Sequence, residues 1–163
     1  MVVLDDRDRV LLLEARDPAD PSKGQWWEIP GGGIEAGESS AAAAARELYE
    51  ETGIRAAVVG PSVWQHRARY TFAGLRFDQL EHIHVARVAA GGDGSPEYRP
   101  GGLEAMEALA FSGLRWWELD RLEAMVGAGG RVLPPWLPEQ LGRFLADGPP
   151  AEPLYLGELP ELF

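Results

Sequence analysis

Residues 32–54 read GGIEAGESSAAAAARELYEETGI, and this stretch carries the strongest structural signal in the sequence. Five consecutive alanines favour a helix because alanine has the highest helix propensity. Ser39 is a suitable N-cap for such a helix, and Gly53 is a residue type that commonly ends one. We therefore expect a helix over residues 39–52.

Three glutamates, Glu47, Glu50 and Glu51, project from one side of this helix because they are spaced at i, i+3 and i+4. Like charges at these spacings destabilise a helix by a few tenths of a kcal/mol per pair, roughly. A solvated acidic surface is one interpretation, since such helix faces are common. The other is a bound divalent cation. Oxygen ligands in a chain with no cysteine favour Mg²⁺ or Mn²⁺.

The residues around these glutamates suit the same chemistry. Glu38 precedes the helix N-terminus, where the helix dipole tolerates negative charge. Glycines at residues 31–33 allow a sharp turn that brings a backbone carbonyl close to the carboxylates. Arg46 can hold one carboxylate through a bidentate pair.

The whole stretch resembles the Nudix box, Gx5Ex7REUxEExGU, where U is an aliphatic residue. The specified positions are all matched, by Gly32, Glu38, Arg46, Glu47, Leu48, Glu50, Glu51, Gly53 and Ile54. Residues 27–31 are similar to the usual entry into the box, and residues 114–119 resemble a strand-to-helix step late in the fold. The resemblance extends over residues 1–126.

This resemblance implies an α+β Nudix fold, a mixed β-sheet sandwiched between α-helices, and we expect residues 1–163 to form one domain. It also implies a hydrolase that uses Mg²⁺ to cut a phosphoanhydride bond in a nucleoside diphosphate linked to another group. Glu50 and Glu51 would be metal ligands, and Glu47 a further ligand or the base that activates water. Glu38 and the Gly32 carbonyl would complete the metal site. Catalytic roles would fall to Glu47, Arg46 and Glu50, with Arg46 orienting a glutamate.

Outside the box, the residues that bind the rest of the substrate are less sharply marked. Arg67 and Arg69 are candidates for phosphate contacts, although exposed strand charges are the simpler interpretation. Tyr70 is a candidate for stacking on a base, as are Trp27 and Phe72, although large aromatic residues more often lie in a core. The resemblance also implies a further acid outside the box, for which Glu107 is favoured over Glu104 and Glu81. A surface glutamate is the simpler interpretation of each. His66, His82 and His84 show no metal-ligand pattern.

The net charge of the chain limits the classes of molecule that it is expected to bind. The 163 residues include 15 basic and 26 acidic side chains, a formal charge of −11. This charge disfavours nucleic-acid polymers and anionic membranes, so we expect a small nucleotide-type substrate. No basic, apolar leader opens the chain, and a cytoplasmic protein is the simplest interpretation. A homodimer is one possible assembly, since many relatives dimerise.

The other elements follow from alternation and turn residues. Residues 1–4 and 10–15 predict a hairpin, and residues 91–102 a loop. The Pro-rich tail over residues 133–163 is expected to pack against its own domain or a second subunit, because its last residues are too apolar for a solvated end. Further strands are expected at 26–29, 63–72, 82–89 and 109–117, and helices at 120–126 and 139–146.

Two rival functions remain. A non-catalytic domain that senses a nucleotide would be expected to lose box carboxylates, which this chain keeps. A Nudix-fold isomerase acting on a prenyl diphosphate typically needs a cysteine, which this chain lacks.

Overall fold

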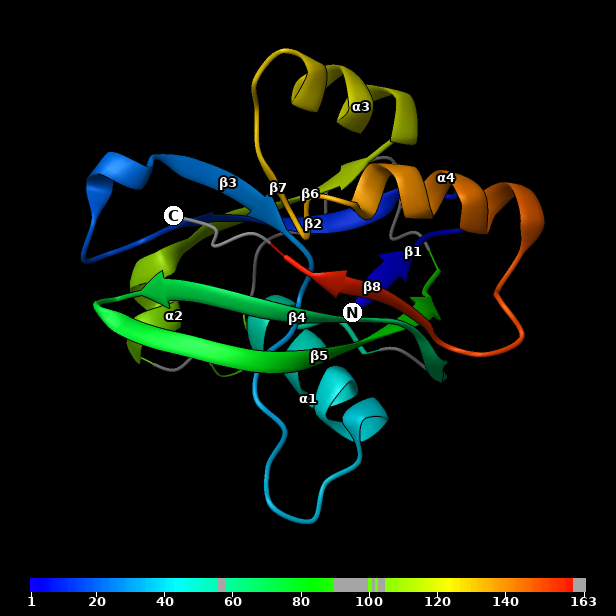
Figure 1. The fold of residues 1–163 in the computed structure, drawn as a ribbon, viewed down its shortest axis with the longest axis horizontal. Coiled ribbons are helices and arrows are strands. Elements are labelled where there is room, and N and C mark those ends of the chain that lie inside the picture. The colour runs from blue at the N-terminus through cyan, green and yellow to red at the C-terminus, as the bar shows by residue number, and fades with distance from the viewer. Residues whose placement is uncertain (56–57, 90–99, 101, 103–104, 160–163) are drawn as a thin grey trace.

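The computed structural model describes residues 1–55, 58–89, 100, 102 and 105–159, with the side chains of residues 105–107 left out. In this part of the chain, eight strands form one mixed sheet with four helices around it (Figure 1). The strands are β1 (Val2–Leu4), β2 (Val10–Arg16), β3 (Gln25–Glu28), β4 (Val59–Phe72), β5 (Leu75–Arg87), β6 (Phe111–Trp117), β7 (Val132–Leu133) and β8 (Leu154–Glu158). The helices are α1 (Ser40–Thr52), α2 (Ala105–Ala110), α3 (Leu119–Gly127) and α4 (Leu137–Asp147).

The sheet mixes parallel and antiparallel pairs. Strand β2 lies antiparallel to β1, β3 and β6, while β1 runs parallel to β5. The remaining pairs are the antiparallel β4–β5 hairpin and the parallel pairs β3–β7 and β4–β8. The predicted α+β architecture, a mixed β-sheet between α-helices, is confirmed, as is the predicted hairpin between residues 1–4 and 10–15.

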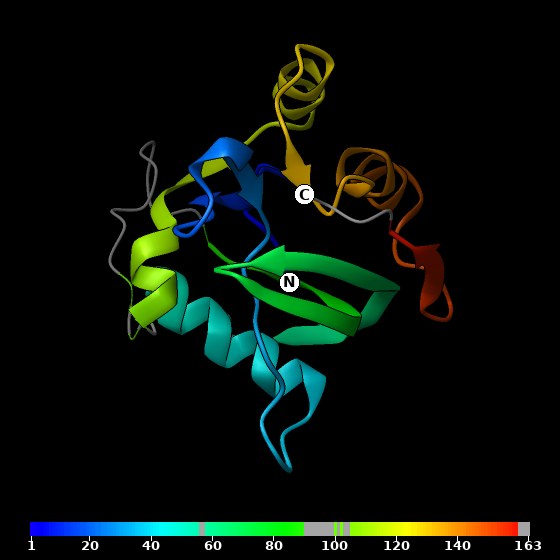
Figure 2. The same ribbon diagram turned by 60° about the vertical axis from the view of Figure 1, so that its left-hand side comes forward.

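Helices cover both faces of the sheet, which explains the uninterrupted apolar runs of β1 and β2. Alternate residues of each strand point to opposite faces. Val2 and Leu12 belong to the core cluster under α3 and α4, whereas Val3 and Leu13 belong to the cluster that includes Leu48 of α1. Figures 1 and 2 show α1 on one side of the sheet, with α3 and α4 on the other.

The β4–β5 hairpin is longer than the alternation predicted. Strand β5 begins at Leu75, where the sequence indicated a strand only from residue 82. Its first half is largely exposed and polar, so it carries no apolar periodicity. The two strands join through Ala73 and Gly74, both with positive φ, which gives the tight turn typical of two-residue hairpins.

One other expectation needs correction. Strand β6 begins at Phe111, because the preceding residues, predicted as part of strand 109–117, belong to helix α2. The tail also forms strand β8, for which no strand was predicted, at the edge of β4, with Trp64 opposite Leu154. The loop predicted over residues 91–102 lies almost wholly outside the described residues.

The tail packs on its own domain through α4 and β8, one of the two arrangements expected for it. Leu137 and Leu141 of α4 are fully buried in the core cluster that contains Trp64. The ring of Phe144 lies 5.6 Å from that of Trp64 in an edge-on arrangement. Leu162 and Phe163 lie outside the described residues. Among the described helices, none is long and apolar enough to cross a membrane.

Leu141→Ala tests whether α4 is part of the cooperative core. Because Leu141 is fully buried, we expect the free energy of unfolding to fall by about 2–5 kcal/mol, measured by urea denaturation. Leu75→Ala is the matched control, because Leu75 is 53% exposed, and it should cost roughly 0.5 kcal/mol or less. Equal effects of the two changes would show that α4 is not integral to the core.

Candidate active site

Helix α1 presents the acidic residues because both of its ends are fixed by the sequence. The Ser39 side chain accepts a hydrogen bond from the backbone N–H of Ala42 at 3.2 Å, which caps the N-terminus. Gly53 ends the helix in the left-handed conformation, with φ 74°, and its N–H donates to the Tyr49 carbonyl. The predicted helix over residues 39–52 is confirmed to within one residue. Glu47 and Glu51 lie on its buried side.

Arg46 lies among the carboxylates and donates to five oxygen atoms. Its Nε and Nη2 bind the two oxygens of Glu38, at 3.2 and 3.0 Å. Nη1 bridges Glu47 Oε1 at 2.8 Å and Glu50 Oε2 at 3.0 Å. Nη2 also donates to the Gly33 carbonyl at 2.8 Å. One guanidinium therefore ties the loop before the helix to two acids on the helix.

These contacts set the ionisation of the group. The hydrogen bonds to Glu38, together with those to Glu47 and Glu50, raise the pKa of Arg46 above its ordinary value, against the effect of desolvation. The hydrogen bond from Arg46 likewise lowers the pKa of Glu38. Arg46 is thus permanently charged and Glu38 is an anion at neutral pH.

Gly32 and Glu51 bring the backbone of the loop close to the helix. A Cβ added at Gly32 would lie 2.6 Å from the carboxyl carbon of Glu47, so a side chain at this position requires Glu47 to move. The Gly31 N–H donates to Glu51 Oε2 at 2.9 Å. Glu51 is only 1% exposed, and this bond fixes one of its oxygens.

The residues fit a hard divalent cation. Glu38, Glu47, Glu50 and Glu51 offer carboxylate oxygens, and the loop glycines offer carbonyls, which together make the all-oxygen donor set that Mg²⁺ prefers. Within the described residues, no three His, Cys, Asp or Glu side chains already form a metal-ligand cluster. Arg46 bridges the acids in this arrangement, so a cation that engages Glu47 and Glu50 would exchange with its Nη1 bonds.

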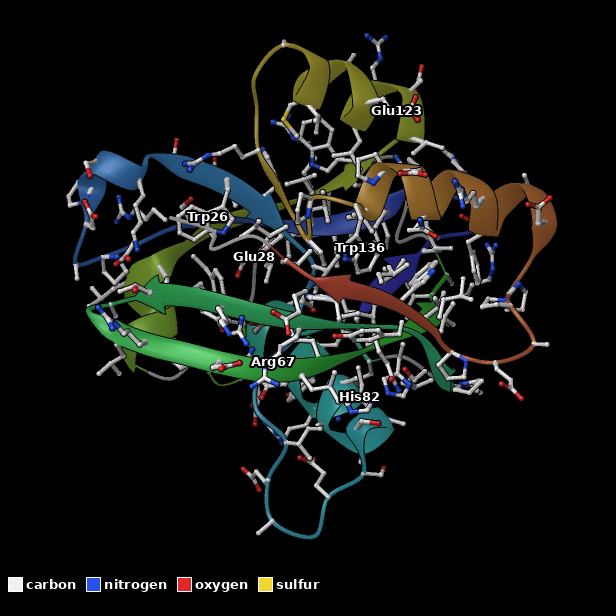
Figure 3. All side chains as sticks on the ribbon, in the orientation of Figure 1. Trp26, Glu28, Arg67, His82, Glu123 and Trp136 are labelled. Atoms are coloured by element: carbon white, nitrogen blue, oxygen red, sulfur yellow. The ribbon has the colours of Figure 1, made fainter. Side chains whose placement is uncertain are left out.

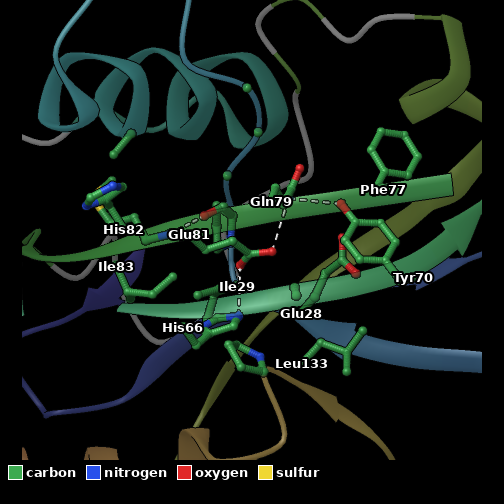
Figure 4. Close-up of a pocket in the computed structure, with 18 of the residues that line it drawn as sticks. Glu28, Ile29, His66, Tyr70, Phe77, Gln79, Glu81, His82, Ile83 and Leu133 are labelled. Carbon is green, nitrogen blue, oxygen red and sulfur yellow. Dashed lines mark hydrogen bonds and ion pairs between the residues drawn. The ribbon is translucent and has the colours of Figure 1, made fainter. Parts of the chain in front are cut away.

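A cavity of about 540 Å³ opens beside the box, a volume typical of small-molecule sites. The loop glycines and Ser40, Ala43 and Glu51 of the box segment form part of its lining. The β4–β5 hairpin forms another part, where Tyr70 and Phe77 stack with ring centroids 5.0 Å apart. Figure 4 shows Tyr70, Phe77 and the polar residues of this wall.

A chain of polar contacts crosses this wall. His66 Nε2 lies 3.2 Å from Glu81 Oε2, and the Gln79 amide donates to Glu81 Oε1 and to the Tyr70 hydroxyl, both at 3.1 Å (Figure 4). Burial opposes ionisation of Glu81, but the bonds from His66 and Gln79 and the charges nearby outweigh it, so its pKa lies below the ordinary value. Glu81 is therefore an anion inside the cavity.

Glu28, the last residue of β3 (Figure 3), lines the same cavity but differs from Glu81 in its ionisation. Burial raises the pKa of Glu28 to about 7, with the negative charge of Glu81 adding and the hydrogen bond from Trp26 Nε1 opposing. Burial, reinforced by the charges of Glu81 and Glu28, raises the pKa of the Tyr70 hydroxyl, so this hydroxyl keeps its proton.

Of the substrate residues predicted outside the box, the structure brings Tyr70 to the cavity, but Arg67 (Figure 3) and Arg69 lie on the other face of β4. They are 45% and 48% exposed and bind Asp78, whose pKa their hydrogen bonds lower to about 2. Neither is among the described residues that line the cavity. Glu104 and the side chain of Glu107 lie outside the described part of the chain. Glu81, named as an alternative, does line the cavity.

The residues missed by sequence reasoning are Glu28 and His66. Strand alternation held a signal for both, because His66 shares the buried face of Trp64 and Ala68, and Glu28 shares the face of Trp26. His84 is structural: its ring bonds the Gly60 carbonyl at 2.8 Å and the Ser40 hydroxyl at 2.9 Å, which ties β5 to the start of α1.

Glu28 makes folding stability depend on pH. The pKa of Glu28 in the folded protein is about 7, above the ordinary 4.5. Its contribution to the free energy of unfolding is therefore complete below about pH 4.5 and is lost as the pH rises through 7. We expect Glu28→Gln to be more stable than the parent at pH 8, by up to about 3 kcal/mol, and similar to it at pH 4.5. Urea unfolding at both pH values measures this difference. Glu123→Gln, on the exposed surface of α3, is the control and should leave the pH dependence of stability unchanged. If the stability difference between Glu28→Gln and the parent were the same at both pH values, the raised pKa of Glu28 would be contradicted.

Comparison with known proteins places this site in a family. The NUDIX domain model matches residues 1–137 of the 163. The putative 8-oxo-dGTP diphosphatase of Bacillus subtilis is 27% identical over 75% of this chain and 66% of its own length. The CMP-5'-(N-acetyl-N-hydroxy-3-aminopropyl)phosphonate hydrolase of Streptomyces rubellomurinus is 32% identical over 81% of this chain and 56% of its own. This chain therefore spans less than two thirds of either relative.

A solved structure shows the same fold. The NUDIX hydrolase from Nitrosomonas europaea superposes with a TM-score of 0.57 at 23% identity, covering 91% of this chain and 88% of that one. The family model covers most of the chain, and the box helix, its arginine and its glycine loop lie in the part that it matches. The chain belongs to the Nudix family.

Proposed function

We propose that this chain is a pyrophosphohydrolase that uses Mg²⁺ or Mn²⁺ to cut a phosphoanhydride bond in a nucleoside diphosphate linked to another group. The observation that carries the proposal is one cavity shared by two kinds of residue. Glu51 and Gly32 of the box line it, and so do the stacked Tyr70 and Phe77 of the hairpin. Such a cavity suits a substrate that carries both phosphates and an aromatic ring.

The box residues would hold the cation. Glu50 and Glu51, with Glu38, Glu47 and the Gly32 carbonyl, supply oxygen donors in a segment tied together by Arg46. A bound divalent cation shields the charge of the phosphates and makes an attacking water more acidic. A chain with a formal charge of −11 would otherwise repel an anionic substrate.

The protein's own groups then account for positioning and proton transfer. Glu47 is buried against Gly32 and held by Arg46, so its carboxylate has a fixed orientation from which to take a proton from water. The water oxygen forms a bond to phosphorus, the bridging P–O bond breaks, and the leaving phosphate keeps the electron pair. Arg46 is a positioning residue, because it acts through the carboxylates.

The relatives support this class of reaction. Their names describe a diphosphatase acting on 8-oxo-dGTP and a hydrolase acting on a CMP derivative. The alternative, a domain that senses a nucleotide without cutting it, is disfavoured because all four box carboxylates are present.

The first test is phosphate-product release from a nucleotide panel, with Mg²⁺, with Mn²⁺ and with chelator. The panel contains nucleoside triphosphates, oxidised nucleotides, ADP-ribose, diadenosine polyphosphates and nucleotide sugars. We expect metal-dependent cleavage of at least one class, and Glu51→Gln should lower kcat at least about 100-fold, because it removes a charged donor from the metal site.

Glu139→Gln serves as the control, because Glu139 is 64% exposed and pairs only with Arg143 among the interactions described. It should leave turnover unchanged. Metal-independent cleavage, or full activity in Glu51→Gln, would contradict the proposal. Tight nucleotide binding without turnover of any substrate would favour the sensing domain.

Gly32→Ala tests the close contact between loop and helix. The added Cβ would lie 2.6 Å from the Glu47 carboxyl, so Glu47 must move. We expect a higher Mg²⁺ concentration for half-maximal activity and about a 10- to 100-fold fall in kcat/KM. In Gly33→Ala the added Cβ meets nothing within 4 Å, so its effect should be much smaller. Equal effects would show that the contact with Glu47 does not matter.

A further inference from the structure

The polar wall of the cavity has a definite pattern of donors and acceptors. Gln79 uses both amide hydrogens, one toward the Tyr70 hydroxyl and one toward Glu81 Oε1. The Gln79 side-chain oxygen is therefore left as an acceptor. Glu81 is anionic and accepts one bond on each oxygen, and a carboxylate has about four acceptor sites. This wall therefore offers acceptors, concentrated at Glu81.

One donor lies next to these acceptors. The Tyr70 hydroxyl accepts from Gln79, and its own hydrogen is free to rotate toward a ligand. Its raised pKa, caused by burial and by the charges of Glu81 and Glu28, keeps that hydrogen in place. A carboxylate acceptor and a hydroxyl donor thus stand side by side, linked through Gln79.

His66 fixes Glu81 from beneath the wall. The imidazole is only 1% exposed and packs edge-on against Trp136, with ring centroids 5.5 Å apart. Its Nε2 faces Glu81 Oε2, while Nδ1 is buried with no hydrogen-bond partner among the described residues. Because the buried ring cannot follow a moving carboxylate, it restricts the position of Glu81. His66 is therefore a positioning residue.

An aromatic ring with an exocyclic amino group beside an unprotonated ring nitrogen complements this pattern. The amino group donates to Glu81, and the ring nitrogen accepts from Tyr70. The corresponding oxo ring presents a carbonyl oxygen and a ring N–H in these places, so its oxygen would face the carboxylate of Glu81. Such a mismatch is costly, because the carbonyl oxygen would face the carboxylate of Glu81 with no hydrogen between the two acceptors.

We propose that Glu81, positioned by His66, makes this enzyme selective for substrates whose base carries such an amino group, as cytosine and adenine do. This inference rests on the proposed function for the identity of the reaction, but not for the recognition itself. The ring lies beside Tyr70 and Phe77, with the phosphates directed toward the box glycines that line the same cavity.

The test compares pairs of nucleotides that differ at the amino position. The ratio of kcat/KM is measured for CTP over UTP and for ATP over ITP, or for the same bases in the substrate class that the panel identifies. We expect the amino member of each pair to be favoured roughly 10- to 100-fold, as for hydrogen bonds to a charged group. In Glu81→Gln, which keeps the shape and loses the charge, the ratio should fall to about 1 or invert.

Two further variants complete the experiment. Glu139→Gln should retain the ratio of the parent protein. His66→Asn should lower the ratio of kcat/KM between the amino and oxo nucleotides. It should do so mainly by raising KM for the amino nucleotide, with a smaller change in kcat. If His66→Asn does not fold, by circular dichroism, Glu81→Gln still decides the outcome, because Glu81 is 28% exposed and replaced by a side chain of the same size. A parent ratio near 1, or a ratio unchanged in Glu81→Gln, would overturn the proposal.

Equilibrium binding separates this inference from the proposed function. Calorimetric titration of Glu51→Gln with CMP, UMP, AMP and IMP requires no turnover. Tighter binding of CMP and AMP, lost when Glu81→Gln is added, supports the selectivity even if no nucleotide is cleaved. Metal-dependent turnover combined with equal binding of all four would leave the hydrolase in place and overturn the selectivity.

Discussion

The guanidinium of Arg46 is the constraint on which the site depends. Glu38, Glu47 and Glu50 repel one another, and Glu47 is also largely buried, so each needs a cation within hydrogen-bond distance. Arg46 meets this need for all three and also holds the Gly33 carbonyl. The loop and the helix are therefore held together as one preorganised unit, and this unit lines part of the neighbouring cavity.

The parts of the fold that the sequence predicted well have local causes. The cap at Ser39, the stop at Gly53 and the spacing of the glutamates depend on residues close in the chain, so the helix and its acidic face could be placed within one residue. The apolar runs of residues 1–4 and 10–15 identified the β1–β2 hairpin. Strand β4 was recognisable over residues 63–72 by its alternation, and helix α4 was predicted to within two residues of its observed bounds.

Long-range contacts explain what could not be predicted. Strand β8 pairs with β4 across about ninety residues, and its Leu154 and Tyr155 are exposed, so it lacks the pattern of a buried strand. His66 and Glu81 meet only because the hairpin register places them opposite each other. Arg67 and Arg69 had the right charge for phosphates, but alternation along β4 turns them toward Asp78 on the outer face.

The pairing of β8 with β4 also limits how copies of this chain can associate through the edge of the sheet. An unpaired edge of a long strand is a template for another chain, and here the tail occupies that edge from Trp64 to Arg67. The Arg69–Glu158 ion pair and the bond from the Leu159 N–H to the Arg67 carbonyl hold the tail in place. The new edge strand has five residues and a Gly157 with positive φ, features that resist continuation of a sheet. Strand β8 therefore blocks association by addition of another strand to this edge of β4.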